Sequence, residues 1–305
     1  YYEEHKNEFK LFEEVRDLEF VKFSVLPSAA DVKAINDSVV KTYAEFQALP
    51  AEEIPSFVSI SSDRVYDSTY HKMDDLKTVF ADSLLQNKKV GDFIAPFQQG
   101  NNWIMAKITD MQARPDSVRF SQLVVLNSNA SKEIKRTPEQ AKIFTDSLFN
   151  ALKSNTAAFE QNVTKYSDDP EAKNNFGDSD WLLDGQLPAE IYAQVKATNV
   201  GGLFVYNLPN EMGHCIIKVT NKTEPKNKMQ LAMIVMGVRA SDKTINETKD
   251  KADVFLGAVK TIADMKAQAQ KQNINILLST VNNMSYQLNG TPYCREIIRW
   301  AFNED

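Results

Sequence analysis

A strand-turn-strand pattern that occurs twice is the feature of this sequence that most restricts its fold. The first copy covers residues 90–109 and the second covers residues 200–220, about one hundred residues later. Each copy opens on a Val-Gly pair, continues as an apolar strand and, after a polar turn, ends in a second apolar strand. A similarity at this spacing predicts tandem modules of about one hundred residues that share one fold.

Each copy follows an apolar stretch that we predict to be the opening strand of its module. These stretches are Val21–Pro27 and Val118–Val125, and a third one begins at Met229. Helical spacing of apolar residues follows the second stretch, at 141–152, after a Thr-Pro-Glu start signal. Counterpart helices are expected at 31–46 and 246–269. The order strand, long helix, short helices, strand, strand predicts an α+β fold.

The repeat also predicts how the chain is divided. Residues 1–15 are expected to be a helical lead-in, 16–112 a first module, 113–224 a second module, and 228–305 a third module that is cut short. Polar stretches that contain a proline separate the modules, because proline disfavours continued helix. The prediction is therefore two complete modules and one truncated module.

Composition excludes several classes of function. The hydrophobic share of 43% and the charged share of 25% are ordinary for a folded protein. A net charge of -6 argues against a nucleic-acid partner, because such binding depends on clustered Lys and Arg. Two cysteines and three scattered histidines predict neither a disulfide framework nor a metal site, and we expect no cofactor. The apolar runs are about one strand long, so a membrane anchor would have to precede Tyr1.

Six short motifs give the second module a family resemblance. Their order and spacing over about 100 residues resemble the parvulin-type peptidyl-prolyl cis-trans isomerases, or rotamases, and Tyr166–Pro170 is the most specific of them. The resemblance implies a four-stranded antiparallel sheet with helices in each module. The motifs are Val118-Arg-Phe-Ser-Gln-Leu-Val124, Tyr166-Ser-Asp-Asp-Pro170, Gly177-Asp-Ser-Asp-Trp181, Gly185-Gln-Leu-Pro188, Val200-Gly201 and Gly213-His-Cys-Ile-Ile-Lys-Val219.

The order of the whole chain is similar to that of the PpiD and SurA group of periplasmic folding factors, most of all to the larger Bacteroidetes-type proteins. In that group an N-terminal chaperone part precedes the parvulin module, so residues 1–15 would enter from such a part. The resemblance implies a periplasmic location and, in PpiD-like members, an inner-membrane anchor. It implies unfolded or nascent envelope polypeptides as partners. Whether the chain forms a homodimer stays open.

The resemblance also identifies where catalysis would occur. Rotation about a peptide bond before proline has a barrier of about 18–20 kcal/mol, which a catalyst lowers by favouring the twisted amide. The family places two histidines on the pocket floor with a Cys or Asp nearby. This sequence has Gln122, after Ser121, and Cys215, after His214, at the two histidine positions, whereas Asp169 matches the third position.

Other positions bear on the same pocket. Leu187 and Ile191 match its apolar lining, and His214 is expected to point to the opposite face from Cys215, because side chains alternate along a strand. Asp169 has a second reading as part of a turn and helix cap. The first module is expected to have Val25 and Ile104 at the histidine positions, which excludes isomerase chemistry of this type there.

Three functions therefore remain open. The first is a chaperone that binds unfolded polypeptide through apolar surfaces, for which the 17 Phe, 10 Tyr and 9 Met supply adaptable side chains. The second is an active prolyl isomerase that uses Asp169 and the apolar pocket. The third is a scaffold whose modules set spacing or dimerise. The loss of both histidines favours the first function.

Overall fold

The computed structural model describes residues 4–5 and 13–303, which form two compact units. The larger unit is Val39–Gly237, and the other joins the described parts of Tyr1–Ser38 and Val238–Asp305. The predicted lead-in helix lies largely outside the described residues. The end of that segment, Val15, begins a strand, β1 (Val15–Val21). Among the described helices, none has the length and hydropathy needed to cross a membrane.

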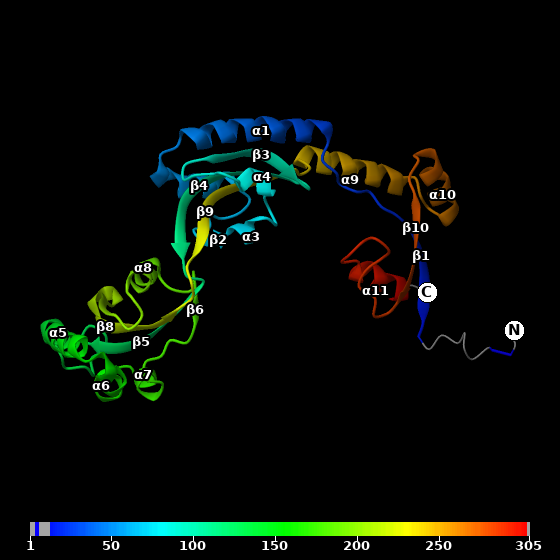
Figure 1. The fold of residues 1–305 in the computed structure, drawn as a ribbon. Coiled ribbons are helices and arrows are strands. Elements are labelled where there is room, and N and C mark those ends of the chain that lie inside the picture. Colours follow the sequence, from blue (N-terminus) through cyan, green and yellow to red (C-terminus); the bar gives the residue numbers. More distant parts are fainter. Residues whose placement is uncertain (1–3, 6–12, 304–305) are drawn as a thin grey trace. The chain divides into compact units, whose positions relative to one another are not determined.

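The larger unit contains two four-stranded antiparallel sheets with equivalent strand orders, shown in Figure 1. One has the order β6-β5-β8-β7, and the other has the order β2-β9-β4-β3. Each sheet therefore has a short edge strand, two long central strands and a hairpin partner, which confirms the predicted α+β fold with tandem modules. The strands of the first order are β6 (Leu182–Leu183), β5 (Ser117–Leu126), β8 (Gly213–Lys222) and β7 (Leu203–Asn207), and those of the second are β2 (Tyr70–Lys72), β9 (Lys226–Gly237), β4 (Asn102–Arg114) and β3 (Phe93–Gln99).

Helices cover both faces of the β5 sheet. On one face lie α5 (Pro138–Ser154), α6 (Phe159–Tyr166) and α7 (Pro170–Asn174), which pack over Leu123 and Ile216. On the other face lies α8 (Ala189–Ala197), which packs over Phe120 and Ile217. Thr137 starts α5, because its side-chain oxygen accepts a hydrogen bond from the Gln140 backbone N–H and the Gln140 side-chain oxygen accepts one from the Thr137 backbone N–H.

The β9 sheet has its own helices. These are the part of α1 (Ala29–Ala48) from Val39 onward, α2 (Ile54–Ser61), α3 (Met73–Leu76) and α4 (Asp82–Leu85). Leu76 of α3 and Leu85 of α4 pack with Ile104 and Leu231 in one buried cluster. Short 3₁₀ helices lie at Ala51–Glu53, Thr156–Ala158 and Pro209–Glu211. The predicted helix at 31–46 is therefore present within α1.

The predicted opening strand of the first module is wrong. Residues 22–28 have no regular structure, and β1 pairs with β10 (Ile276–Asn282) in the other unit. The strand that begins at Met229, which we expected to open a third module, instead lies between β2 and β4 as part of β9. The sheet of the first module is thus a circular permutation of the sheet of the second module. Its strand β9 comes last in the chain, whereas the equivalent strand β5 comes first in the second module.

The hydrogen-bonding details support this correspondence. In the β4-β9 pair the register shifts at Thr109, and in the β5-β8 pair it shifts at Thr220, as expected for one extra residue in a β-bulge. The turns before β3 and β7 also match, because Gly91 donates to the Ile108 carbonyl and Gly201 donates to the Val219 carbonyl. The two copies of the hairpin predicted from the sequence therefore share their backbone geometry.

A buried ion-pair network lies where the chain passes from β4 into β5 and from β8 into β9. The Arg114 Nε and Nη2 atoms lie 2.9 and 2.7 Å from the two Asp184 carboxylate oxygens, and Lys228 Nζ lies 2.9 Å from Oδ2 of the same carboxylate. The Arg114 guanidinium also stacks between the rings of Tyr70 and Tyr192. The Asp184 side chain is 7% exposed, so its charge depends on these two partners.

The smaller unit is built on the β1-β10 pair. Its described helices are α9 (Asp242–Gly257), α10 (Ile262–Lys271) and α11 (Arg295–Asn303). The helix predicted at 246–269 is divided in two, because Thr261 caps the start of α10 with its side chain. Val281, Leu288, Cys294 and Ile298 form a buried cluster there. Both Cys215 and Cys294 are free thiols.

Candidate functional site

Gln122 and Cys215, the residues at the two family histidine positions, face the same side of the second sheet. Gln122 lies on β5 opposite Ile217, and Cys215 lies on β8 opposite Val124. The Cys215 Sγ atom is 4.0 Å from the Gln122 Oε1 atom, within reach of a weak S–H···O hydrogen bond. The structure therefore brings the two replaced positions together.

The Cys215 thiol is buried and unreactive. Only 2% of the residue is exposed. Burial raises the pKa of the thiol to about 12, and the negative charge of Asp169 also raises it, whereas a backbone hydrogen bond from Leu123 acts in the opposite direction. A thiol with such a pKa stays protonated at neutral pH and is a poor nucleophile.

Asp169 serves as a helix cap in this structure. Its Oδ1 atom accepts a hydrogen bond of 3.0 Å from the Glu171 backbone N–H at the start of α7. The same carboxylate lies close enough to Cys215 for its charge to raise the thiol pKa. The contacts of Asp169 are therefore those of the helix cap that the sequence suggested, and a catalytic role for Asp169 stays a prediction.

The remaining residues of the Tyr166–Pro170 motif fasten the outer edge of β5. Ser167 Oγ accepts from the Val124 N–H at 3.3 Å, and the Asp168 N–H donates to the Val124 carbonyl at 2.8 Å. Asp168 Oδ2 also accepts from the Leu126 N–H at 2.8 Å and from Arg136 at 2.7 Å. We refer to this set of bonds as the Ser-Asp latch.

The next motif closes the same edge further along. The Gln122 N–H donates to the Gly177 carbonyl at 2.8 Å, and the Ser179 N–H donates to the Phe120 carbonyl at 2.9 Å. Gly177 has φ +73°, and a Cβ atom there would lie 2.1 Å from the Gln122 carbonyl oxygen. Glycine is thus required for this close approach. Asp178, between these residues, forms an ion pair with Arg119 that the sequence reading missed.

An apolar surface surrounds Gln122 and Cys215. Leu187 and Ile191, the predicted lining residues, pack half-buried against the cluster that contains Cys215. Phe204 and Tyr206 of β7 belong to the same surface, and Tyr206 lies opposite Cys215. The sequence reading missed both aromatic residues, although their alternation along a strand beside the Cys215 strand was a usable signal.

Two of the predicted binding residues lie elsewhere. Ser121 is buried and alternates with Gln122 on β5, so its side chain lies on the α5 side with that of Leu123. His214 borders a cavity with Pro138 and Lys142 of α5, and its Nδ1 atom lies 2.9 Å from Asn207 Oδ1. Burial and the nearby charge of Lys142 lower the pKa of its imidazole.

The first module contains a second Ser-Asp latch. The Val235 N–H donates to Ser62 Oγ at 3.0 Å, the Asp63 N–H donates to the Val235 carbonyl at 2.8 Å, and Asp63 Oδ2 accepts from the Gly237 N–H at 2.7 Å. These bonds match those of Ser167 and Asp168 with Val124 and Leu126 one by one. The latch therefore fixes which residues of the two modules correspond.

This correspondence corrects one predicted position. Met233, two residues before Val235, takes the place of Gln122, and Ile104, opposite Val235, takes the place of Cys215. Arg64 follows the latch as Asp169 does in the second module. Val25, the residue predicted for the first histidine position, lies outside the sheet. Ile104 was predicted at the second position, and the structure confirms it there.

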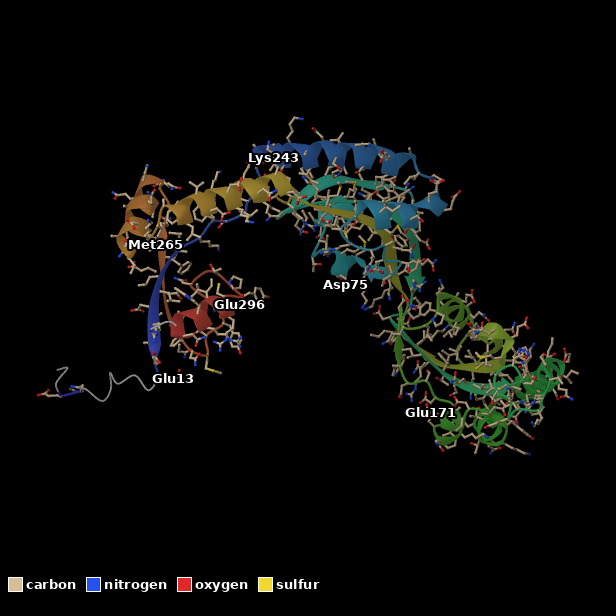
Figure 2. The ribbon with its side chains drawn as sticks, turned by 180° about the vertical axis from the view of Figure 1, so that it is seen from behind. Glu13, Asp75, Glu171, Lys243, Met265 and Glu296 are labelled. Atoms are coloured by element: carbon tan, nitrogen blue, oxygen red, sulfur yellow. The ribbon has the colours of Figure 1, made fainter. Side chains whose placement is uncertain are left out.

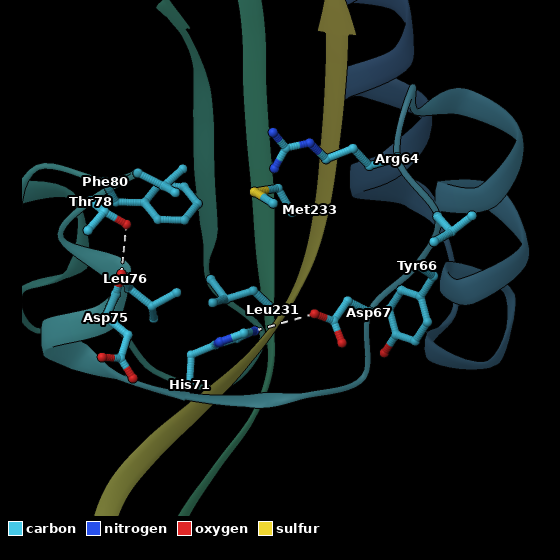
Figure 3. A pocket seen from close by; sticks show the side chains of 12 residues that line it. Arg64, Tyr66, Asp67, His71, Asp75, Leu76, Thr78, Phe80, Leu231 and Met233 are labelled. Atoms are coloured by element: carbon cyan, nitrogen blue, oxygen red, sulfur yellow. Dashed lines mark hydrogen bonds and ion pairs between the residues drawn. The ribbon is translucent and has the colours of Figure 1, made fainter. Parts of the chain in front are cut away.

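A cavity of about 700 Å³ opens on the Met233 side of the sheet of the first module. Figure 3 shows the side chains that line it. Its apolar lining includes Leu76, Phe80, Leu231 and Met233, and charged side chains stand around it. Asp75, one of these charged residues, belongs to α3 and is labelled in Figure 2. The full lining is Arg64, Val65, Tyr66, Asp67, His71, Asp75, Leu76, Thr78, Val79, Phe80, Leu231 and Met233.

The second module matches a family of known proteins. Residues 103–223 match the family model described as the PPIC-type PPIase domain. The chaperone SurA of Escherichia coli O6:H1 is 24% identical over 110 residues, which are 36% of this chain and 26% of that protein, and SurA of Salmonella choleraesuis matches equally. The chain thus spans about a quarter of the length of the curated relatives that it matches.

Three solved structures that resemble parts of the chain differ in how much of the chain they cover. TbPIN1 is 20% identical with a TM-score of 0.31 and covers 35% of this chain and 98% of its own. PrsA from Bacillus anthracis is 16% identical with a TM-score of 0.28, covering 81% and 99%. A SurA-like chaperone structure from Campylobacter jejuni is 15% identical with a TM-score of 0.28, covering 76% and 71%.

The family model covers the second module, which contains the Ser167-Asp168 latch, the Gln122–Cys215 pair and the apolar surface around that pair. The second module is therefore a parvulin-type domain of the PPIC class, and over 110 residues the chain is similar to the chaperone SurA.

Proposed function

We propose that this chain is a folding factor that holds unfolded polypeptide and that its second module has little or no prolyl isomerase activity. The observation that carries this proposal is the Gln122–Cys215 pair. An amide and a protonated thiol, 4.0 Å apart, replace two imidazoles on the sheet face. Neither side chain exchanges a proton near neutral pH, and the pair offers only weak, neutral hydrogen bonding to a twisted amide.

The surface that would grip a chain remains. Leu187, Ile191, Phe204 and Tyr206 stay half-buried around the replaced pair, so they keep apolar area within reach of a ligand. Burial of such area contributes about 25 cal/mol per Å² to binding, without any need for a catalytic group. This division between gripping and catalysis supports the chaperone reading over the enzyme reading.

Partners and location follow from the same proposal. Unfolded or nascent envelope polypeptides are the proposed partners, supported by the relatives that carry the name chaperone SurA. The proposed location is the cell envelope outside the cytoplasm, with the periplasm as the finer expectation. An inner-membrane anchor and a homodimer stay predictions.

Two assays on the same protein test the proposal. The first measures light scattering of an aggregating client during refolding, and the second measures the slow, proline-limited phase of a soluble refolding protein without any protease. We expect suppressed scattering and an unchanged slow phase. An accelerated slow phase would contradict the proposal, and a lack of effect in both assays would favour the scaffold function.

Asp169 gives the enzyme alternative its one specific support. Its charge reaches Cys215, so a carboxylate does lie near the replaced histidine positions. Asp169→Asn separates the two functions, because asparagine still caps α7 while the negative charge is removed. If isomerisation is measurable and Asp169→Asn removes it while Glu171→Gln does not, the enzyme alternative is correct.

A further inference from the structure

The two modules differ at one stretch of sheet edge. In the second module, Gly177 and Ser179 bond to the Gln122 N–H and the Phe120 carbonyl, so the chain itself covers the edge of β5. When the two Ser-Asp latches are aligned, Met233 and Leu231 of β9 correspond to Gln122 and Phe120 of β5. Within the described ranges, no backbone hydrogen bond equivalent to these two reaches the Met233 N–H or the Leu231 carbonyl.

A shorter connection explains the difference. From Asp169 the chain of the second module runs through α7 and residues 177–179 before it reaches β6 at Leu182. From Arg64 the chain of the first module reaches β2 at Tyr70 directly, without a helix in between. Since Val235 directs its backbone N–H and carbonyl outward to the latch, Met233 and Leu231, two and four residues earlier, direct theirs to the same side.

The cavity described above borders this open edge. Leu231 and Met233 belong both to the edge and to the cavity lining, and Leu76 and Phe80 line the side away from Arg64. A volume of about 700 Å³ lies within the range of about 300–1,000 Å³ found for ligand sites. The site therefore offers backbone hydrogen bonds next to an apolar space.

Charged side chains stand at the two ends of the cavity. Arg64 lies beside Met233, whereas Asp67, His71 and Asp75 lie toward the other end, as Figure 3 shows. His71 Nε2 is 3.6 Å from Asp67 Oδ2, while Asp75 is exposed. A ligand that runs antiparallel to β9, as residues 177–179 run along β5, would pass from the Arg64 end to the Asp75 end.

We propose that the first module binds an extended segment of a client polypeptide as an added strand on β9 at Leu231–Met233. This inference rests on the proposed function and names the place and mode of client binding. Residues 177–179 give the template: one ligand residue accepts from the Met233 N–H, and the residue two positions later donates to the Leu231 carbonyl.

The template also defines the ligand. The middle residue corresponds to Asp178, which pairs with Ser121 and lies on the far face, so the two flanking residues point toward the cavity. The favoured segment therefore has apolar residues at alternate positions. An acidic residue before them would meet Arg64, and a basic residue after them would meet Asp67 and Asp75.

A backbone-modified peptide tests the proposed mode on the full chain. The probe is a fluorescent Ser-Glu-Phe-Thr-Leu-Lys-Ser peptide, followed by anisotropy. Methylation of the Leu amide nitrogen removes the hydrogen bond to the Leu231 carbonyl, and we expect affinity to fall by about tenfold. Methylation of the Thr amide is the matched control, since the corresponding Asp178 N–H bonds within its own turn. Equal effects of the two methylations would overturn strand addition.

A charge exchange tests the proposed place. Arg64→Glu should weaken the probe by about threefold, as expected for an exposed ion pair, and a probe with Lys in place of Glu should recover the loss. Lys132→Glu, which changes the net charge equally in the second module, should have no effect. Absence of recovery by the exchanged probe would overturn the assignment to this cavity.

Two further outcomes are distinguishable. If scattering of clients is suppressed but neither peptide test responds as expected, the strand-addition site is wrong while the chaperone function stands. If the chain forms a concentration-dependent dimer that the probe dissociates, the occupant of the edge is a second copy and the client assignment is overturned.

Discussion

Met233 and Gln122 occupy the same place in two sheets, each two residues before a valine whose backbone is held by a Ser-Asp latch. One sheet keeps a polar side chain there, and the other has a thioether beside a cavity. The two modules therefore share a framework but offer different surfaces. In neither module do the described residues place a pair of histidines at these positions.

Restoring the histidine pair is expected to create isomerase activity. The double change Gln122→His and Cys215→His returns two imidazoles to side chains that now lie within 4.0 Å of each other. We expect the slow refolding phase of a proline-limited substrate to accelerate, since general acid–base catalysis by a positioned side chain typically contributes about 10²-fold or more. The single change Gln122→His is the control and should leave the rate unchanged, because one imidazole alone does not restore the pair.

The Cys215 thiol is expected to resist modification in the folded protein. With a pKa of about 12 and 2% exposure, almost no thiolate is present and no reagent can reach it. Mass spectrometry after treatment with iodoacetamide at pH 8 should find Cys215 unmodified, and modified after the same treatment in denaturant. Rapid labelling of native protein would mean that the cleft floor is open to solvent.

Much of this arrangement could be predicted from the sequence. The repeated hairpin, the helix after Thr137 and the proximity of Gln122 and Cys215 all follow from local patterns and one family resemblance. The permuted strand could not be predicted in this way, because an apolar strand such as Met229–Val235 carries no signal for which sheet it joins. Nor could the second latch, since Ser62-Asp63 lacks the residues that make Tyr166–Pro170 recognisable.

Gly177→Ala is expected to destabilise the second module strongly. A Cβ atom would lie 2.1 Å from the Gln122 carbonyl oxygen, so β5 and its covering segment must separate. Gly185→Ala is the matched control, because Gly185 also has a positive φ but nothing lies near its Cβ position. We expect the control to cost about 1–2 kcal/mol of unfolding free energy and Gly177→Ala clearly more. Equal costs in urea unfolding would show that the close approach does not exist.

The Asp184 network is expected to make stability depend on pH in the acidic range. Burial acts to raise the pKa of Asp184, but the hydrogen bonds and charges of Arg114 and Lys228 outweigh it and hold the pKa below its usual value. A lowered folded-state pKa stabilises the fold above the unfolded value of about 3.9, and this stability is lost as pH falls through the folded pKa.

Asp184→Asn tests this relationship. At pH 7 it should lower the free energy of unfolding by about 3 kcal/mol, because the buried Arg114 loses its carboxylate partner and Lys228 keeps only Asp116. The difference from the natural chain should shrink as pH falls below about 4. Asp180→Asn, at a carboxylate that is 93% exposed, should change little at any pH. A difference for Asp184→Asn that is independent of pH would contradict the assigned charge state.

The loss of isomerase activity is tested by the rate of cis-trans exchange in a proline-containing peptide, measured by NMR exchange spectroscopy with and without the full chain. We expect exchange at the uncatalysed rate with the natural sequence and faster exchange with the Gln122→His, Cys215→His variant. Fast exchange with the natural sequence, lost on Asp169→Asn, would contradict it.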